Sequence, residues 1–178
     1  MLIAYAISGA IIGAIATWSF LAFSGLPAWC AFIAWAALLH SGSEKSVPSK
    51  TISCMCFGVF LSWGMAVALI SNILPFSTAI NGAILVAAAV PLIIASSRWS
   101  ALSITPAVFY GFASTFGFLV QTPGKLSLPA LTEHGFNNPA IVVLMSMAIG
   151  VALGYLHVKL ASIFYESLKG RPGLTSTK

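Results

Sequence analysis

Hydrogen-bonding side chains recur along one stretch of otherwise apolar sequence. Ser103, Tyr110, Ser114 and Gln121 follow spacings of seven, four and seven residues, so a continuous helix places all four on one side. From the first to the last, that helix rises about 27 Å, nearly the thickness of a bilayer's hydrocarbon core. Such a row predicts a lining that hydrogen-bonds a small uncharged solute. The alternative is hydrogen bonding between helices that only holds a bundle together.

Two other apolar runs carry polar candidates for the same solute pathway. Ser62 precedes Trp63, whose indole predicts either a stacking slot for a planar solute or a core or lipid-anchoring ring. Ser146 and His157 share a helical face in the last run. Because His157 is close to Lys159, an interfacial position is favoured over a proton relay.

Small residues predict where helices approach each other. Gly150 and Gly154 form a G-x-x-x-G on the face that carries Ser146 and His157, and Gly9 and Gly13 repeat this spacing near the amino terminus. Such pairs permit close contact between membrane helices. Helix packing is therefore the favoured role of the four glycines, and narrowing of a pathway is the alternative.

Acid-dependent chemistry has few residues to use. The chain has three glutamates, Glu44, Glu133 and Glu166, and no aspartate. Neither H-E-x-x-H nor G-x-S-x-G occurs in it. The sequence therefore predicts that the protein is not an enzyme and uses no cofactor.

The three cysteines, Cys30, Cys54 and Cys56, lie inside apolar runs. This position favours buried thiols over a disulfide framework. A metal site at the C-x-C is the alternative, but no acid lies in that run. We therefore expect no bound metal.

The elements that carry these residues are predicted to be membrane helices. Hydrophobic residues make up 59% of the 178 residues, charged residues make up 6%, and mean hydropathy is +1.00, which excludes soluble and disordered chains. The sequence predicts an all-α integral membrane protein with a single membrane domain and a polar cytoplasmic tail over 169–178. The six expected spans are 2–23, 27–40, 51–72, 79–97, 101–120 and 139–160.

Two of these runs have unusual ends. The first lacks the basic residues that open a signal peptide, so a retained helix is favoured over cleavage. The second stays apolar only from Pro27 to Leu39. It is short for a full crossing and either tilts little or ends at a polar cavity.

The cations predict the orientation. With the amino terminus inside, one set of seven cations is cytoplasmic and only Lys125 is outside. The inside set is Lys45, Lys50, Arg98, Lys159, Lys169, Arg171 and Lys178. This asymmetry predicts six spans with both termini cytoplasmic.

A weak internal repeat divides the chain in two. Residues 9–16 read GAIIGAIA and residues 82–89 read GAILVAAA, and Pro27-Ala28 and Pro106-Ala107 each open the next helix. Halves of three spans each would have opposite orientations, as in inverted-repeat transporters and channels. Chance matches between apolar segments are the alternative.

Several of these residues also carry a family resemblance. Over 13–32 they are Gly13, Trp18, Gly25, Leu26, Trp29 and Phe32, and later they are Ser62, Trp63, Pro106, Phe109, Gly111, Ala113, Thr115, Phe116, Gly150, Gly154 and Tyr155. With them the chain resembles the small bacterial inner-membrane proteins grouped as domain of unknown function 1097. The resemblance implies a bacterial inner-membrane location but no activity and no functional residue. The segment 121–138 is longer than the family pattern implies.

These observations favour a passive channel or facilitator for a small neutral polar solute, assembled from identical subunits. Its expected partners are the lipid bilayer, copies of itself and the solute, and no nucleic acid. The alternative is a non-transporting scaffold or regulatory subunit for a partner protein, whose interior would be dry and fully packed. An interior cavity that water reaches from both sides would distinguish the two.

Overall fold

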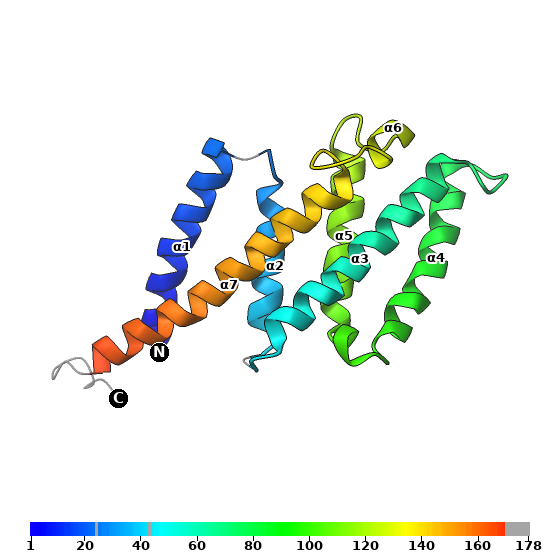
Figure 1. The fold of residues 1–178 in the computed structure, drawn as a ribbon. Helices are drawn as coiled ribbons and strands as arrows, with labels where there is room; N and C mark the ends of the chain where they lie inside the picture. The colour runs from blue at the N-terminus through cyan, green and yellow to red at the C-terminus, as the bar shows by residue number, and fades with distance from the viewer. Residues whose placement is uncertain (24, 43, 170–178) are drawn as a thin grey trace.

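The computed structural model describes residues 1–23, 25–42 and 44–169. It is 80% helical, and no strand occurs among these residues. The elements are α1 (Leu2–Phe23), α2 (Ala28–His40), α3 (Val47–Ile70), α4 (Thr78–Ser96), the 3-10 turn η1 (Ser100–Leu102), α5 (Thr105–Gln121), α6 (Leu128–Leu131) and α7 (Pro139–Lys169). Figure 1 shows α7 crossing the molecule diagonally past the other helices.

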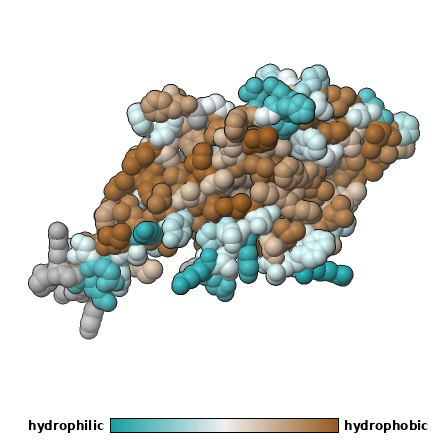
Figure 2. Space-filling view, in the orientation of Figure 1, coloured by the Kyte–Doolittle hydropathy of each residue, from teal (hydrophilic) through white to brown (hydrophobic). Residues whose placement is uncertain are grey.

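The long helices run in alternating directions (Figure 1). The amino terminus, the α2–α3 and α4–α5 connections and the end of α7 lie at one end of the bundle, and the α3–α4 connection and α6 lie at the other. Apolar side chains occupy the middle of the surface in view and hydrophilic ones gather at these two ends (Figure 2). An apolar band between two polar ends is the surface that a bilayer requires.

Four helices are long and apolar enough to cross a membrane, namely α1, α3, α4 and α7. Helix α2 is apolar but has only 13 residues, and α5 has 17. The all-helical fold is therefore that of a multi-pass membrane protein, with four candidate spans by length and composition.

Several helix bounds differ from the apolar runs. Helix α3 begins at Val47, within the polar stretch, because Pro48 fits the first turn of a helix, where its missing N–H is not needed. Helix α5 begins only at Thr105, after η1 and a short connection. Helix α7 continues through its amphipathic end to Lys169, a length of about 46 Å. The polar tail was predicted over 169–178; Lys169 is the last residue of α7, and 170–178 lie outside the described residues.

The helices pack as two pairs that meet in the middle. Helix α3 packs along α5, α2 packs along α7, and α3 also contacts α7. The outer helices α1 and α4 lie against α7 and α3, respectively. Buried apolar residues of α2, α3, α5 and α7 form the main core, so these four helices position the candidate site.

Candidate functional site

The predicted polar row is shorter than expected. Ser103 lies between η1 and α5 and donates a hydrogen bond to the carbonyl of Ser100 at 3.0 Å. The prediction that one helix carries all four side chains over about 27 Å is therefore wrong, because α5 begins at Thr105. On α5 itself, Tyr110 and Gln121 are exposed and Ser114 is buried.

Three buried hydroxyls are without an adequate hydrogen bond within the described residues: that of Thr51 in α3 and those of the predicted pathway residues Ser62 and Ser114. Ser114 of α5 is 1% exposed, and its hydroxyl lies beside the thiol of Cys30, a weak partner. Ser62 of α3 is fully buried. Neither oxygen has a geometrically sound hydrogen bond within the described residues. An unsatisfied buried polar group costs roughly 1–3 kcal/mol, so a hydrogen-bond partner at either oxygen would be stabilising.

Two other buried hydroxyls are satisfied within their own helices. Thr115, next to Ser114, donates to the carbonyl of Gly111 at 2.9 Å, and Ser96 donates to the carbonyl of Ile93 at 2.7 Å. Both bonds stay within the donor's own helix. The contrast shows that the unpaired state of Ser62 and Ser114 is not general for buried hydroxyls in this bundle.

Trp63 anchors the segment between α5 and α7. Its indole nitrogen donates to the carbonyl of Leu131 in α6 at 2.9 Å. Asn138 donates to the same carbonyl at 3.0 Å, and its side-chain oxygen accepts from the amide of Ala140 in the first turn of α7. The long segment is thus tied to α3 and α7. The anchor uses the indole nitrogen, and solute stacking on the ring stays a prediction.

His157 is buried between three helices, α1, α2 and α7. It is 7% exposed. Its Nδ1 lies 3.2 Å from the indole nitrogen of Trp35 in α2, and its Nε2 lies 3.0 Å from the carbonyl oxygen of Tyr5 in α1. Because the indole can only donate, the neutral tautomer with hydrogen on Nε2 satisfies both contacts. Lys159 points to another helical face, and the interfacial position of His157 stays a prediction.

Ser146 makes a hydrogen bond between helices at the start of α2. Its hydroxyl donates to the carbonyl of Pro27 at 2.6 Å. Cys54 of α3 makes a related contact ahead of α5, where its thiol donates to the carbonyl of Ala101 at 3.6 Å. Ser146 of α7 thus bonds to the residue just before α2, the helix on which α7 packs. Cys54 of α3 bonds to a residue shortly before α5, the helix on which α3 packs.

Three of the four predicted packing glycines lie in tight contacts. A Cβ at Gly150 would collide with the backbone of Ala31. At Gly154 it would lie 2.9 Å from Leu38 Cδ2, and at Gly9 it would lie 3.1 Å from His157 Nε2. Gly13 differs, because a Cβ there would meet only an ordinary contact with Trp35 at 3.9 Å.

The sequence reasoning missed a second set of packing glycines. A Cβ at Gly58 would collide with the backbone of Val108 and Phe112, and one at Gly111 would collide with the backbone of Met55. The α3 and α5 backbones therefore touch. Neither glycine belongs to a G-x-x-x-G, so the motif search had no signal for them.

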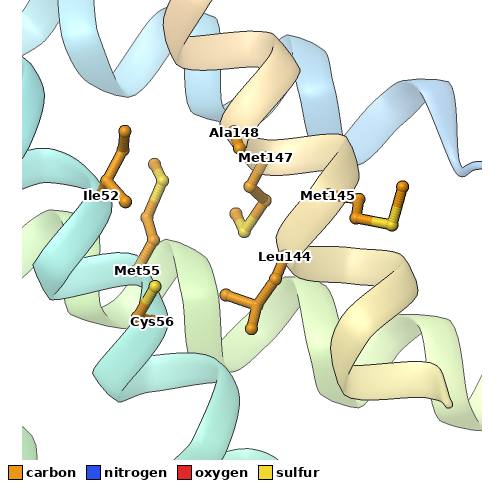
Figure 3. A pocket seen from close by; sticks show the side chains of 7 residues that line it. All are labelled: Ile52, Met55, Cys56, Leu144, Met145, Met147 and Ala148. Atoms are coloured by element: carbon orange, nitrogen blue, oxygen red, sulfur yellow. The ribbon is translucent and has the colours of Figure 1, made fainter. Parts of the chain in front are cut away.

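One cavity of about 260 Å³ lies between α3 and α7 (Figure 3). Ile52, Met55 and Cys56 of α3 face Leu144 and Met147 of α7 across it. Its lining is almost wholly apolar. It therefore suits a small apolar group better than a polar solute.

Two more cavities lie around α2 and α7. The larger, about 520 Å³, has both charged and apolar residues in its wall, including Glu44, Lys45 and Leu38. The other, about 280 Å³, is an open depression beside Gly9 and His157. Of the predicted pathway residues, only His157 lines any of these three cavities.

Metal ligands do not gather in the part of the chain that the structure describes. No three His, Cys, Asp or Glu side chains there are grouped closely enough to hold an ion. Cys30, Cys54 and Cys56 are free thiols. The chemistry that the described interior offers is hydrogen bonding by neutral groups.

The chain was compared with known protein families, curated proteins and solved structures. A family model described as "Protein of unknown function (DUF1097)" matches residues 6–162. The comparisons with curated proteins and with solved structures found no match.

Proposed function

The chain belongs to the DUF1097 family of proteins of unknown function, and from its geometry we propose that it is a passive channel or facilitator for a small neutral polar solute. The proposed location is the bacterial inner membrane. The observation that carries the proposal is the pair of buried, inadequately paired hydroxyls of Ser62 and Ser114. We propose no enzymatic step.

A neutral solute that leaves water must recover its hydrogen bonds, because an unpaired amide or hydroxyl in an apolar medium costs roughly 2–7 kcal/mol. Ser62 and Ser114 belong to α3 and α5, which pack along each other. Hydroxyls donate and accept equally well. They can therefore bind a small alcohol or amide weakly enough to release it, as conduction requires.

The proposal includes six crossings with both termini in the cytoplasm. Its support is the alternating direction of α1, α2, α3, α4, α5 and α7 (Figure 1). Lys45 and Arg98 lie in the two connections at the end that also holds the amino terminus, whereas Lys125 lies in the α5–α6 connection at the other end. The short helices α2 and α5 contribute buried residues to the core between the longer helices, where protein can surround backbone that does not cross the whole bilayer.

The proposal also includes two inverted three-helix repeats, α1–α3 and α4, α5 and α7. In this repeat α1 corresponds to α4, α2 to α5 and α3 to α7. The packing of α3 on α5 then corresponds to that of α7 on α2, and the packing of α1 on α7 corresponds to that of α4 on α3. Packing glycines follow the same rule, since Gly58 contacts α5 at Val108 and Gly150 contacts α2 at Ala31. These matched contacts support the repeat over chance similarity between apolar segments.

Buried positions in the outer helices support the same relation. Ala16 and Ala89 are both buried, as are Phe20 and Ile93, and each pair is separated by 73 residues. This is also the separation of the two similar octapeptides. Inverted repeats in transporters place the substrate path where the halves meet, which here is the region of α2, α3, α5 and α7.

Assembly from identical subunits completes the proposal. Tyr110 of α5 is 36% exposed, and its phenol would gain a hydrogen-bond partner at a protein interface that lipid tails cannot offer. Crosslinking of the protein in its native membrane tests this. A monomer at every crosslinker concentration would contradict it.

The decisive test is solute flux in proteoliposomes. Vesicles with the purified protein are expected to swell faster than empty vesicles in at least one small alcohol or amide and not in larger or charged solutes. Topology is tested separately by replacing the native cysteines and labelling single cysteines with an impermeant reagent. A cysteine at exposed His134 is expected to react from the periplasm and one at exposed Ser46 is not.

A scaffold or regulatory subunit is the second candidate. The backbone contacts at Gly58 and Gly150 favour it, because they close the two main interfaces tightly. Swelling equal to that of empty vesicles for every solute would favour this candidate over the facilitator.

A further inference from the structure

The largest cavity described above lies apart from Ser62 and Ser114, at the bundle end that holds the α2–α3 connection. Its volume is about 520 Å³. Leu38 and Leu39 of α2 and Val158 of α7 form an apolar wall. A cavity of this shape at the end of a membrane helix bundle meets both lipid tails and headgroups.

The cavity wall also contains charged and aromatic residues. Glu44 and Lys45, which precede α3, contribute one charge of each sign, and Tyr5 and Tyr155 contribute phenol rings. Glu44 and Lys45 are exposed, and neither forms an ion pair with another described residue. Both charges are therefore available to a ligand.

From these features we propose that this cavity binds a zwitterionic phospholipid whose headgroup ends in a primary ammonium, the phosphatidylethanolamine class. The ammonium donates to the Glu44 carboxylate, the phosphate accepts from the Lys45 ammonium, and the acyl chain follows Leu38, Leu39 and Val158. Charge-assisted bonds of this kind are stronger than neutral ones.

Charge complementarity selects this class over related ligands. An anionic headgroup without an ammonium can pair its phosphate with Lys45 but leaves the Glu44 carboxylate without a cation. A choline headgroup carries no N–H and cannot donate to the carboxylate. Free phosphate uses Lys45 alone and leaves the apolar wall uncovered. The site does not depend on the proposed transport role.

The test is native mass spectrometry of the full-length protein after exchange into mixed micelles with equal amounts of phosphatidylethanolamine, phosphatidylcholine and phosphatidylglycerol. Wild-type protein is expected to retain phosphatidylethanolamine preferentially. Glu44→Gln should lower that preference over phosphatidylcholine about tenfold, the equivalent of 1.4 kcal/mol. Lys45→Gln should weaken retention of phosphatidylethanolamine and phosphatidylcholine together.

Glu133→Gln and Lys125→Gln are the matched controls, because both residues lie near the opposite end of the bundle. They should leave retention unchanged. Equal retention of the three lipids, or an unchanged preference in Glu44→Gln, would overturn the proposal. Displacement of the lipid by equimolar water-soluble glycerophosphoethanolamine would also overturn it, since the ligand would then be a soluble molecule.

Discussion

The two main helix pairs are similar in backbone packing and different in their use of polar side chains. In both pairs a glycine lets two backbones touch, Gly150 of α7 on α2 and Gly58 of α3 on α5. The α2–α7 pair adds hydrogen bonds between helices, from Ser146 to Pro27 and from Trp35 to His157. The α3–α5 pair instead carries the inadequately paired hydroxyls of Ser62 and Ser114.

This difference separates two uses of a polar group in a membrane bundle. A hydroxyl or imidazole that bonds to a neighbouring helix stabilises the fold. One that is buried without a sound partner lowers stability and remains available to a guest. Polar groups of the α2–α7 pair therefore hold helices together, whereas the unpaired hydroxyls of the α3–α5 pair are the groups that the proposed function assigns to the solute.

The similarity in backbone packing gives the largest expected effect. Gly58→Leu and Gly150→Leu each force a side chain into the backbone of a neighbouring helix. Overpacking usually costs about 1–3 kcal/mol, and a collision with backbone is at the upper end or beyond. We expect most of the folded protein to be lost in both variants, as measured by detergent-solubilised yield and thermal unfolding.

Gly64→Leu is the control for these variants. Gly64 is also in α3, and a Cβ there would meet nothing within 4 Å. Its yield and unfolding temperature should match those of wild type. If Gly58→Leu were as stable as Gly64→Leu, the close contact between α3 and α5 would be wrong.

The next effect concerns the hydrogen bonds of His157. His157→Ala leaves the Trp35 indole nitrogen buried without its acceptor, which costs about 1–3 kcal/mol in addition to the cavity. A double-mutant cycle with Trp35→Phe measures the bond itself, and we expect a coupling of about 0.5–3 kcal/mol. Additive effects of the two changes would show that this bond does not stabilise the α2–α7 pair.

The repeat relation gives this prediction an internal comparison. In the proposed repeat, α3 corresponds to α7 with a shift of 92 residues, as from Gly58 to Gly150, and α2 corresponds to α5 with a shift of 77 residues, as from Ala31 to Val108. By these shifts His157 corresponds to Met65 and Trp35 to Phe112, and both Met65 and Phe112 are buried and apolar. No hydrogen bond can be lost there. Met65→Ala and Phe112→Leu should therefore show only the packing losses expected of their lost side-chain volume.

Composition was enough to predict an all-helical membrane chain, because apolar run length is a local property. The start of α5 was not predictable in this way, since Ala101 and Leu102 are as apolar as the helix that follows. The partners of His157 were not predictable either. Tyr5 and Trp35 lie 152 and 122 residues away in the chain, and only the packing of α1 and α2 on α7 brings them together.

The glycines show the same limit. Gly150 and Gly154 carried a recognised spacing, but Gly58 and Gly111 gain their role from facing each other's helices. The spacing of Tyr110 and Ser114 predicted that both lie on one face of α5. Packing against the neighbouring helices buries Ser114 but leaves Tyr110 exposed. Helical periodicity places residues on a face, and neighbouring helices determine what covers it.

A smaller effect is expected from the related contacts ahead of α2 and α5. Ser146→Ala should cost about 0.6 kcal/mol and at most about 1.7 kcal/mol, the range for hydrogen bonds between membrane helices. Cys54→Ala should cost less through its hydrogen bond, because a thiol is a weak donor. Unfolding in mixed detergent micelles measures both.

Ser162→Ala is the control for Ser146→Ala. Its hydroxyl is exposed and donates to the backbone carbonyl of Lys159 within α7. Removal of this hydroxyl should therefore leave stability unchanged. Equal losses at Ser146 and Ser162 would mean that the bond to Pro27 adds nothing to the α2–α7 pair.

The smallest effect on stability, and the one that tests function, is expected at Ser62 and Ser114. Ser62→Ala and Ser114→Ala each remove a buried hydroxyl without a sound partner, so stability should stay the same or rise slightly. Solute flux should fall about two- to tenfold for each, since one hydrogen bond is worth about 0.5–1.5 kcal/mol. Thr115→Val is the matched control, because Thr115 already bonds to Gly111 within α5, and its flux should equal that of wild type. If the serine variants instead had lower stability and unchanged flux, both hydroxyls would stabilise helix packing, as the polar groups of the α2–α7 pair do. The scaffold would then be the favoured function.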